Sequence, residues 1–380
     1  MSVPMTRNRT LAVSTLGIVF ALVFVAAPSA RRATADTLPQ RLSDQEYWKI
    51  ITDFSEADGY FRSDNLLSNE IWFQTVIPEL LQRTKGGGNV YMGVGPEQNF
   101  TYISALKPKM VFITDVRRGN LHEHLMYKAL FELSNDRADF VSRLFSKKRP
   151  EGLTAKSSGT ELMNAFWDVQ TSPEAVYRQN VKDIQDLLTK KHALPISQVD
   201  LQAIADNVYY NFYWFGPSIN YNSSSNNNGR GGNMVNYADL MSANDGNGLN
   251  RSFLGSEENF QVLKDLEERN MLVPIVGNFA GPKALRAVGK YLKEHQATVA
   301  AFYLSNVEQY LNQDNIWPQF CANVASLPLD EHSTFIRSSG GGRGYGGGGG
   351  LVSSLASMRD DTRGCGVPGQ GGAPVLRMFQ

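Results

Sequence analysis

Two short apolar runs, separated by one helix-length segment, restrict the possible folds most strongly. The first run spans Val90–Met92 and ends in the turn Gly93–Pro96, and the second spans Met110–Thr114 and ends at Asp115. Continuous apolar runs of this length are typical of strands that are buried on both faces. Residues 97–106 between them predict a helix. This order of elements predicts a parallel sheet with crossover helices.

The same alternation returns in the second half of the chain. Apolar runs at Met271–Val276 and Thr298–Leu304 predict two further strands, each followed by a turn and a helix. Residues 334–337 and 375–379 predict a last pair of strands, which we expect to be antiparallel. We therefore predict an α/β fold with a mostly parallel, Rossmann-like sheet that is flanked by helices and ends in antiparallel strands.

Three further segments border or interrupt this sheet. Residues 136–191 are charged and helix-prone, and residues 223–232 are rich in Ser, Asn and Gly and predict a surface loop. Together they indicate a long, mostly helical insertion over residues 136–255. Within it, Tyr209–Phe215 are nearly all aromatic, which favours core packing over a platform for stacking ligands. Residues 340–350 are almost all glycine, which predicts a flexible segment. We expect residues 66–380 to form one domain, preceded by an extension at 36–65.

Capping residues mark several expected helix starts. Ser43 and Glu46 have the spacing of a capping box. Asn120 is the expected N-cap of a helix over residues 121–133, and Ser256 is that of another helix in the second half. Apolar residues at helical spacing also predict a helix over 66–81.

The N-terminal residues have the pattern of an export signal. Arg7 and Arg9 precede an apolar run at residues 11–27, and Ala33-Thr34-Ala35 fits a small-residue cleavage site. The run is also close to the ~20 residues that span a bilayer, so an uncleaved anchor is the alternative. We expect residues 1–35 to be a signal peptide or membrane anchor, and the protein to be exported or anchored through residues 11–27.

The overall charge argues against nucleic acid as a partner. The 37 basic and 37 acidic residues cancel, whereas binding to a phosphate backbone needs a basic face. The two cysteines, Cys321 and Cys365, would form one disulfide in an oxidising compartment or stay unpaired. The expected partners are therefore a small-molecule ligand and, if the N-terminal segment is uncleaved, a membrane.

Turns that follow predicted strands are the candidate ligand sites, because parallel strands present their carboxyl ends at one edge of a sheet. In the first turn, Gly93 and Gly95 would let the backbone approach a ligand closely. Asp115 ends the second strand about twenty residues later, where an acidic side chain accepts hydrogen bonds from ribose hydroxyls. The alternatives are a plain tight turn at the glycines and an ion pair of Asp115 with Arg117 or Arg118.

Two later turns offer polar side chains at the same expected edge. Asn278 follows the third strand and would present an amide to a substrate or a cofactor. Ser305 and Asn306 follow the fourth strand, and Glu308 stands where it would complete a capping box. For this fourth turn, helix capping is the favoured interpretation.

The sequence His122-Glu123-His124 contains two metal-ligating residue types but lacks the spacing of a metal site. Residues two apart point to different faces of a helix, and Met126 stands where a second ligand would share the face of His122. We therefore expect no metal here. His122 is still a candidate catalytic acid or base, although a surface histidine is the commoner case.

The glycine turn and Asp115 resemble the first glycine motif and the acidic ribose-binding position of S-adenosylmethionine-dependent methyltransferases. The stretches GVGPEQNFTYI, FITDVRRGN, FYLSNVEQYL and STFIRSSGGG also resemble an uncharacterised bacterial family with this predicted fold. The resemblance covers most of the chain from about Leu42 to Arg337 and implies S-adenosylmethionine as cofactor. The residues it implies for the site are Gly93, Gly95 and Asp115 to hold the cofactor, Glu97 and Asn99 to shape the pocket, and Asn278 to position the acceptor.

Three functions are compatible with these patterns. The first is a methyltransferase-like protein with an unknown acceptor, since methyl transfer depends mainly on positioning and desolvation. The second is an exported, non-catalytic envelope protein on the same fold, favoured by the export signal and by Met92 standing where an acidic residue usually precedes the first glycine. The third is a nicotinamide-dependent oxidoreductase, although the third glycine of the dinucleotide motif is absent.

Overall fold

The computed structural model describes residues 1–2, 36–63, 65–221, 223, 235–340 and 351–365. The described residues from Asp36 onward form one compact unit. Three sequence predictions fall wholly or almost wholly outside the described residues: the export signal or anchor, the glycine-rich segment and the strand at 375–379.

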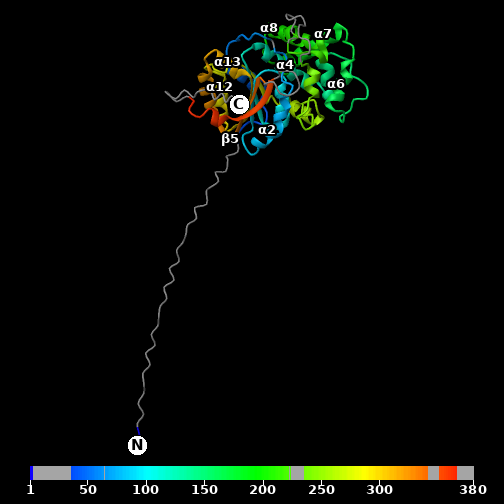
Figure 1. Cartoon of the computed structure of the whole chain (residues 1–380). Coiled ribbons are helices and arrows are strands. Elements are labelled where there is room, and N and C mark those ends of the chain that lie inside the picture. Colours follow the sequence, from blue (N-terminus) through cyan, green and yellow to red (C-terminus); the bar gives the residue numbers. More distant parts are fainter. Residues whose placement is uncertain (3–35, 64, 222, 224–234, 341–350, 366–380) are drawn as a thin grey trace. The chain divides into compact units, whose positions relative to one another are not determined.

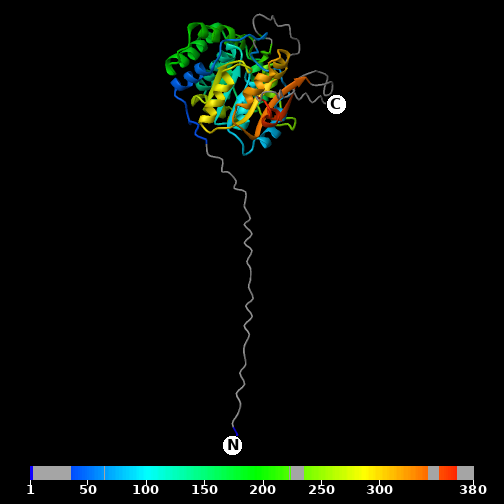
Figure 2. The ribbon, with the colours of Figure 1, turned by 90° about the vertical axis from the view of Figure 1, so that its left-hand side faces the viewer.

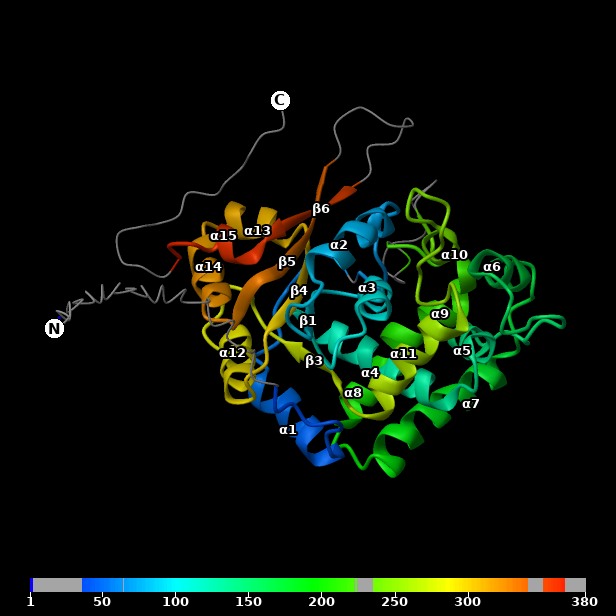
Figure 3. The same cartoon turned by 90° about the horizontal axis from the view of Figure 1, so that it is seen from below.

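A six-stranded mixed sheet forms the centre of the fold (Figures 1 and 3). Its strands lie in the order β3-β2-β1-β4-β5-β6. All neighbouring pairs are parallel except β5 and β6, which are antiparallel. The predicted α/β fold with a mostly parallel sheet and antiparallel C-terminal strands is therefore confirmed. The strands are β1 (Val90–Gly93), β2 (Met110–Asp115), β3 (Leu272–Val276), β4 (Val299–Ser305), β5 (Leu329–Gly340) and β6 (Leu351–Ser357).

Strands β1 to β4 are buried almost throughout, which explains why they are apolar runs rather than alternating patterns. Helices α12 and α14 lie on one side of the sheet, and α2, α3 and α4 lie on the other (Figure 3). The helices and helical turns are α1 (Asp44–Phe54), η1 (Phe73–Val76), α2 (Ile77–Arg83), α3 (Gln98–Leu106), α4 (Arg118–Leu133), α5 (Arg137–Leu144), α6 (Gly159–Trp167), α7 (Glu174–Asp186), η2 (Leu187–Lys191), α8 (Gln198–Gln202), η3 (Ala203–Tyr209), α9 (Tyr210–Phe215), η4 (Gly216–Ser218), α10 (Tyr237–Ser242), α11 (Glu257–Glu268), α12 (Ala284–Glu294), α13 (Val307–Gln313), α14 (Trp317–Ala325) and α15 (Met358–Asp361).

The segment between α4 and α11 is helical, as predicted, and extends away from the C-terminal strands (Figures 1 and 3). Its aromatic cluster packs as expected at Phe212, which is fully buried, but Trp214 is 60% exposed. The middle of this insertion lies beside α1 (Figure 2), where the His192 ring contacts the carboxylate of Asp44 at 2.7 Å. The insertion is thereby tied to the N-terminal helix.

Several predicted helix starts are confirmed and two are wrong. Ser43 and Glu46 form the expected capping box of α1, and Ser256 caps α11. Asn120 is not an N-cap, because α4 already begins at Arg118. The helix predicted over 66–81 begins only at η1, since the residues before it line a cavity instead of continuing the helical face.

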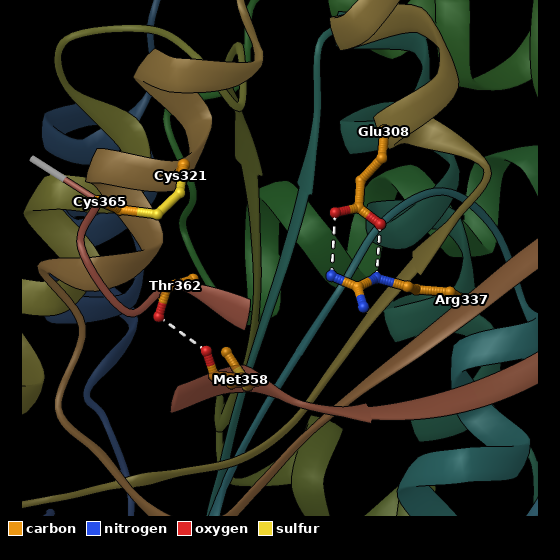
Figure 4. Close-up of a disulfide and its surroundings, with 6 residues drawn as sticks. All are labelled: Glu308, Cys321, Arg337, Met358, Thr362 and Cys365. Carbon is orange, nitrogen blue, oxygen red and sulfur yellow. Dashed lines mark hydrogen bonds and ion pairs between the residues drawn. A yellow bond between two sulfur atoms is a disulfide. The ribbon is translucent and has the colours of Figure 1, made fainter. Parts of the chain in front are cut away.

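A disulfide joins Cys321 of α14 to Cys365, just beyond α15 (Figure 4). The two cysteines are 44 residues apart, and their Cα atoms are 5.5 Å apart. The loop that the disulfide closes contains β5 and β6, so it holds the antiparallel edge of the sheet to a helix. Strand β6 itself was not predicted from the sequence, because its small and polar residues carry little strand signal.

Candidate functional site

A cavity of about 440 Å³ lies at the carboxyl ends of the parallel strands. It is lined by Val94–Pro96 after β1, Asp115–Arg117 around the end of β2, Asn278 after β3 and Ser305–Val307 at the end of β4. Parallel strands with crossover helices bring their following turns to one edge, which is where ligands bind in sheets of this type. The size is within the range of cofactor and small-molecule sites. The four turns singled out in the sequence therefore meet at one cavity.

The turn after β1 is held by Asn99. Its side-chain amide donates to the carbonyls of Val94 (2.9 Å), Gly95 (3.3 Å) and Pro96 (2.7 Å), and its carbonyl oxygen accepts from the hydroxyl of Tyr91 (2.9 Å). Asn99 thus shapes the turn from behind and does not line the cavity.

The two glycines of this turn have different roles. A Cβ atom on Gly93 would lie 1.9 Å from Oδ1 of Asn99, so Gly93 makes room for the side chain that holds the turn. Gly95 has φ +75°, which favours glycine, and a Cβ there would meet no atom within 4 Å. Of the two, only Gly95 lines the cavity, and it offers an open stretch of backbone to a ligand.

Glu97 does not line the cavity either. It is fully buried, and neither of its carboxyl oxygens has a hydrogen-bond partner among the described residues. Burial raises the pKa of Glu97 to about 8, although nearby backbone amides act in the opposite direction. Burial and the charge of Glu97 likewise raise the pKa of Glu123 well above its usual value. Both carboxyl groups are buried, and neither Glu97 nor Glu123 is among the residues that line the cavity.

Asp115 reaches the cavity but is already paired. Its Oδ1 accepts from the backbone amide (2.9 Å) and Nε (3.0 Å) of Arg117, and its Oδ2 accepts from the guanidinium at 3.0 Å. Both side chains are about nine-tenths buried. The ion pair that the sequence offered as the alternative is therefore formed. A ligand hydroxyl would have to share the carboxylate with Arg117.

The turn after β3 is organised around Glu56 from the N-terminal extension. The carboxylate of Glu56 accepts from the backbone amides of Asn278 (3.1 Å), Lys283 (2.9 Å) and Ala284 (2.9 Å). It thereby occupies the position where an anion would meet the N-terminus of α12. Asn278 lines the cavity, but its Oδ1 accepts from the amide of Ala280 at 2.9 Å.

The fourth turn is not a capping box, contrary to the prediction. Asn306 is at the N-cap position of α13 but makes no side-chain capping bond. Ser305, at φ +50°, donates to Oε1 of Glu70 at 2.5 Å instead. Glu308 is drawn to Arg337 of β5, at 2.5 Å (Figure 4). Ser305 therefore bonds to a residue of the cavity wall, and Glu308 forms an ion pair with strand β5.

His122 is not among the residues that line the cavity. Its Nε2 lies 2.7 Å from Oδ1 of Asp200, which also pairs with Arg118 at 2.7 Å. Burial lowers the pKa of His122, and the bond to Asp200 only partly opposes this. The structure gives His122 a place in an ion-pair network between α4 and the insertion.

Several residues that line the cavity were not predicted from the sequence. Tyr60, Phe61 and Arg62 come from the N-terminal extension, and Arg62 donates to the hydroxyl of Tyr310 at 3.1 Å. Glu70 and Tyr303 also line the cavity, and both are buried. None of them stands in a recognisable motif. Glu70 directly follows the polar residues Ser68 and Asn69, so no local pattern distinguishes it.

Residues 66–347 match the family described as Domain of unknown function (DUF7790). The chain belongs to the DUF7790 family. The matched span contains the sheet through β5 and Glu70, whereas Tyr60, Phe61 and Arg62 precede it. No curated protein is detectably similar to the chain. Membership of the DUF7790 family agrees with the resemblance to an uncharacterised family, and it does not indicate an activity.

The described part of this DUF7790 chain contains no cluster of His, Cys, Asp or Glu side chains with the arrangement of a metal site. Among the same residues, no helix is long and apolar enough to cross a membrane. The apolar run at 11–27 lies outside them, so anchoring through that run stays a prediction.

Proposed function

We propose that the cavity binds a small nucleoside-type ligand, with S-adenosylmethionine as the first candidate, and that the protein is methyltransferase-like. One observation carries the proposal: the open backbone at Gly95 and the carboxylate of Asp115 line the same cavity at the end of two adjacent parallel strands. This combination suits a ligand with a ribose and an extended polar chain. Gly95 and Asp115, together with Arg117, would hold such a ligand.

The cofactor would supply the methyl group, and the chain would supply binding, orientation and exclusion of water. Aromatic side chains of the cavity wall, including Tyr60 and Tyr221, would cover the ligand. Asn278 would be the residue nearest to an acceptor on the β3 side. Methyl transfer asks the protein mainly for alignment of donor and acceptor, which side chains of this kind provide.

An exported binding protein without catalysis is the second candidate. The disulfide between Cys321 and Cys365 favours it, because disulfides persist in oxidising compartments. S-adenosylmethionine is a cytosolic cofactor, so a wholly exported chain would use the same cavity for another ligand.

Calorimetric titration of the full chain with S-adenosylmethionine and, separately, with NAD tests the proposal. Asn69 lines the cavity and is partly exposed, so Asn69→Trp should fill the cavity and abolish binding. The matched control is Asn164→Trp, an identical change at an exposed position of α6. Binding of NAD alone would favour the oxidoreductase, and no binding of either ligand by the folded wild type would favour the non-catalytic protein.

A further inference from the structure

Glu70 is a buried carboxylate whose hydrogen bonds all come from neutral groups. Its Oε1 accepts from the hydroxyls of Tyr303 (2.9 Å) and Ser305 (2.5 Å). Its Oε2 accepts from the amide of Gln98 (3.0 Å) and the hydroxyl of Ser338. These donors come from α3, β4 and β5, so three elements converge on one carboxylate that is 1% exposed.

The charge of Glu70 is not balanced within the described residues. No described Lys, Arg or His forms an ion pair with it, whereas the other buried acid of the cavity, Asp115, is paired with Arg117. Arg62 and Asp314 also line the cavity, but both are exposed and their charges are screened by water. Buried charges are normally paired, because isolated burial is costly.

The neutral donors hold the carboxylate of Glu70 in place without neutralising its charge. Glu70, Tyr303 and Ser305 all form part of the cavity wall. The wall is also rich in aromatic rings, which attract cations to their faces. Tyr60, Tyr221 and Tyr303 belong to it, while the ring of Tyr310 is already covered by the guanidinium of Arg62, 5.6 Å from its centroid.

We infer that the ligand of this cavity carries a positively charged organic group, a sulfonium or a substituted ammonium, that lies against Glu70. The cation would balance the buried carboxylate, and the tyrosines would desolvate it without competing for its charge. This inference rests on the proposed function, because both concern the same cavity, and it adds the charge of the ligand. The choice of probes separates the failure of one from the failure of the other.

The direct test compares two probes of equal shape, choline and its uncharged isostere 3,3-dimethyl-1-butanol, by titration of the full chain. We expect choline to bind about tenfold more tightly, because only it carries the charge. Glu70→Gln keeps the size of the side chain and should abolish this preference. Equal binding of the two probes to the wild type, or no binding of choline, would overturn the inference.

A second pair of variants keeps Glu70 and its donors intact. Asn69→Lys places an ammonium in the cavity next to Glu70 and should remove the preference for choline, whereas Asn69→Met should retain it. Asn164→Lys adds the same charge on the exposed face of α6 and should behave as the wild type. A preference that survives Asn69→Lys would refute the role of Glu70 even if Glu70→Gln does not fold.

S-adenosylmethionine and S-adenosylhomocysteine distinguish the two kinds of cation. If the sulfonium lies against Glu70, the first should bind more tightly than the second, and Glu70→Gln should equalise them. If S-adenosylmethionine does not bind but the preference for choline holds, the proposed function fails and the inference stands with an ammonium ligand. If S-adenosylmethionine binds and choline shows no preference, the inference fails and the proposed function stands.

Discussion

Replacement of Glu97 by Gln should make the protein more resistant to alkaline pH. Glu97 is fully buried behind the turn after β1, and burial raises its pKa from 4.5 to about 8. Between these values, the folded state keeps a proton that the unfolded state has released. Because the folded state then binds more protons, stability falls as pH rises through this window. Glutamine has nearly the same shape and no proton to lose.

The magnitude follows from the width of the window. Each unit of pKa corresponds to about 1.4 kcal/mol, so the interval from pH 5 to pH 8 is worth about 4 kcal/mol. The free energy of unfolding of Glu97→Gln, minus that of the wild type, should rise by about this amount over the interval. Any loss of hydrogen bonding in the variant adds a constant offset, so the change with pH is the informative quantity.

Urea unfolding at a series of pH values from 5 to 8 measures this difference directly. The control is Glu151→Gln, because Glu151 is exposed and should leave the pH dependence unchanged. If the curves of Glu97→Gln and the wild type run parallel across the interval, Glu97 is not held protonated in the folded state.

Three further predictions concern stability. Cys321→Ser with Cys365→Ser should lower the free energy of unfolding by about 4 kcal/mol, as expected for a loop of this length, and an unchanged urea midpoint would contradict this. The side chain of Glu132 is 1% exposed and is bound by Lys128, Lys191 and His192, and its pKa is lowered to about 2 against the cost of burial. Its contribution to the free energy of unfolding is complete above about pH 4.5 and is lost as pH falls towards 2. Glu132→Gln should therefore lower the free energy of unfolding by about 3 kcal/mol at pH 7 and by progressively less in acid. A loss of stability that does not depend on pH would rule this out. Gly95→Ala should lower the free energy of unfolding by about 1 kcal/mol because of its positive φ alone. Gly93→Ala should lower it by at least twice as much, because its Cβ meets Asn99. Thermal unfolding that ranks the two variants in the other order would refute this division of roles.

Strands β1 to β4 could be predicted because they are buried on both faces and their sequences are continuous apolar runs. The positions of Gly95, Asp115 and Asn278 at one cavity followed from the rule that parallel strands end at a common edge. The roles of Glu97 and Asn99 could not be predicted. Their side chains point behind the turn, and sequence spacing does not say on which side of a turn a side chain packs.

Other parts of the site depend on contacts between distant segments. Glu70 meets Ser305 and Ser338 across more than half of the chain, and no local pattern marks such a meeting. Glu56 likewise accepts hydrogen bonds at the N-terminus of α12, more than 200 residues away in the sequence. Strand β6 contains three serines and only one β-branched residue, Val352, so its place depends on pairing with β5 more than on its own sequence.

Hydrogen exchange of the full chain with and without S-adenosylmethionine would locate the ligand at the cavity or exclude it from there. We expect slower exchange in the peptides that contain Gly95 and Asp115, with no change in the helices of the insertion that lie away from the cavity. Unchanged exchange at both positions in the presence of saturating S-adenosylmethionine, or protection confined to another region, would contradict the assignment of this cavity as the ligand site.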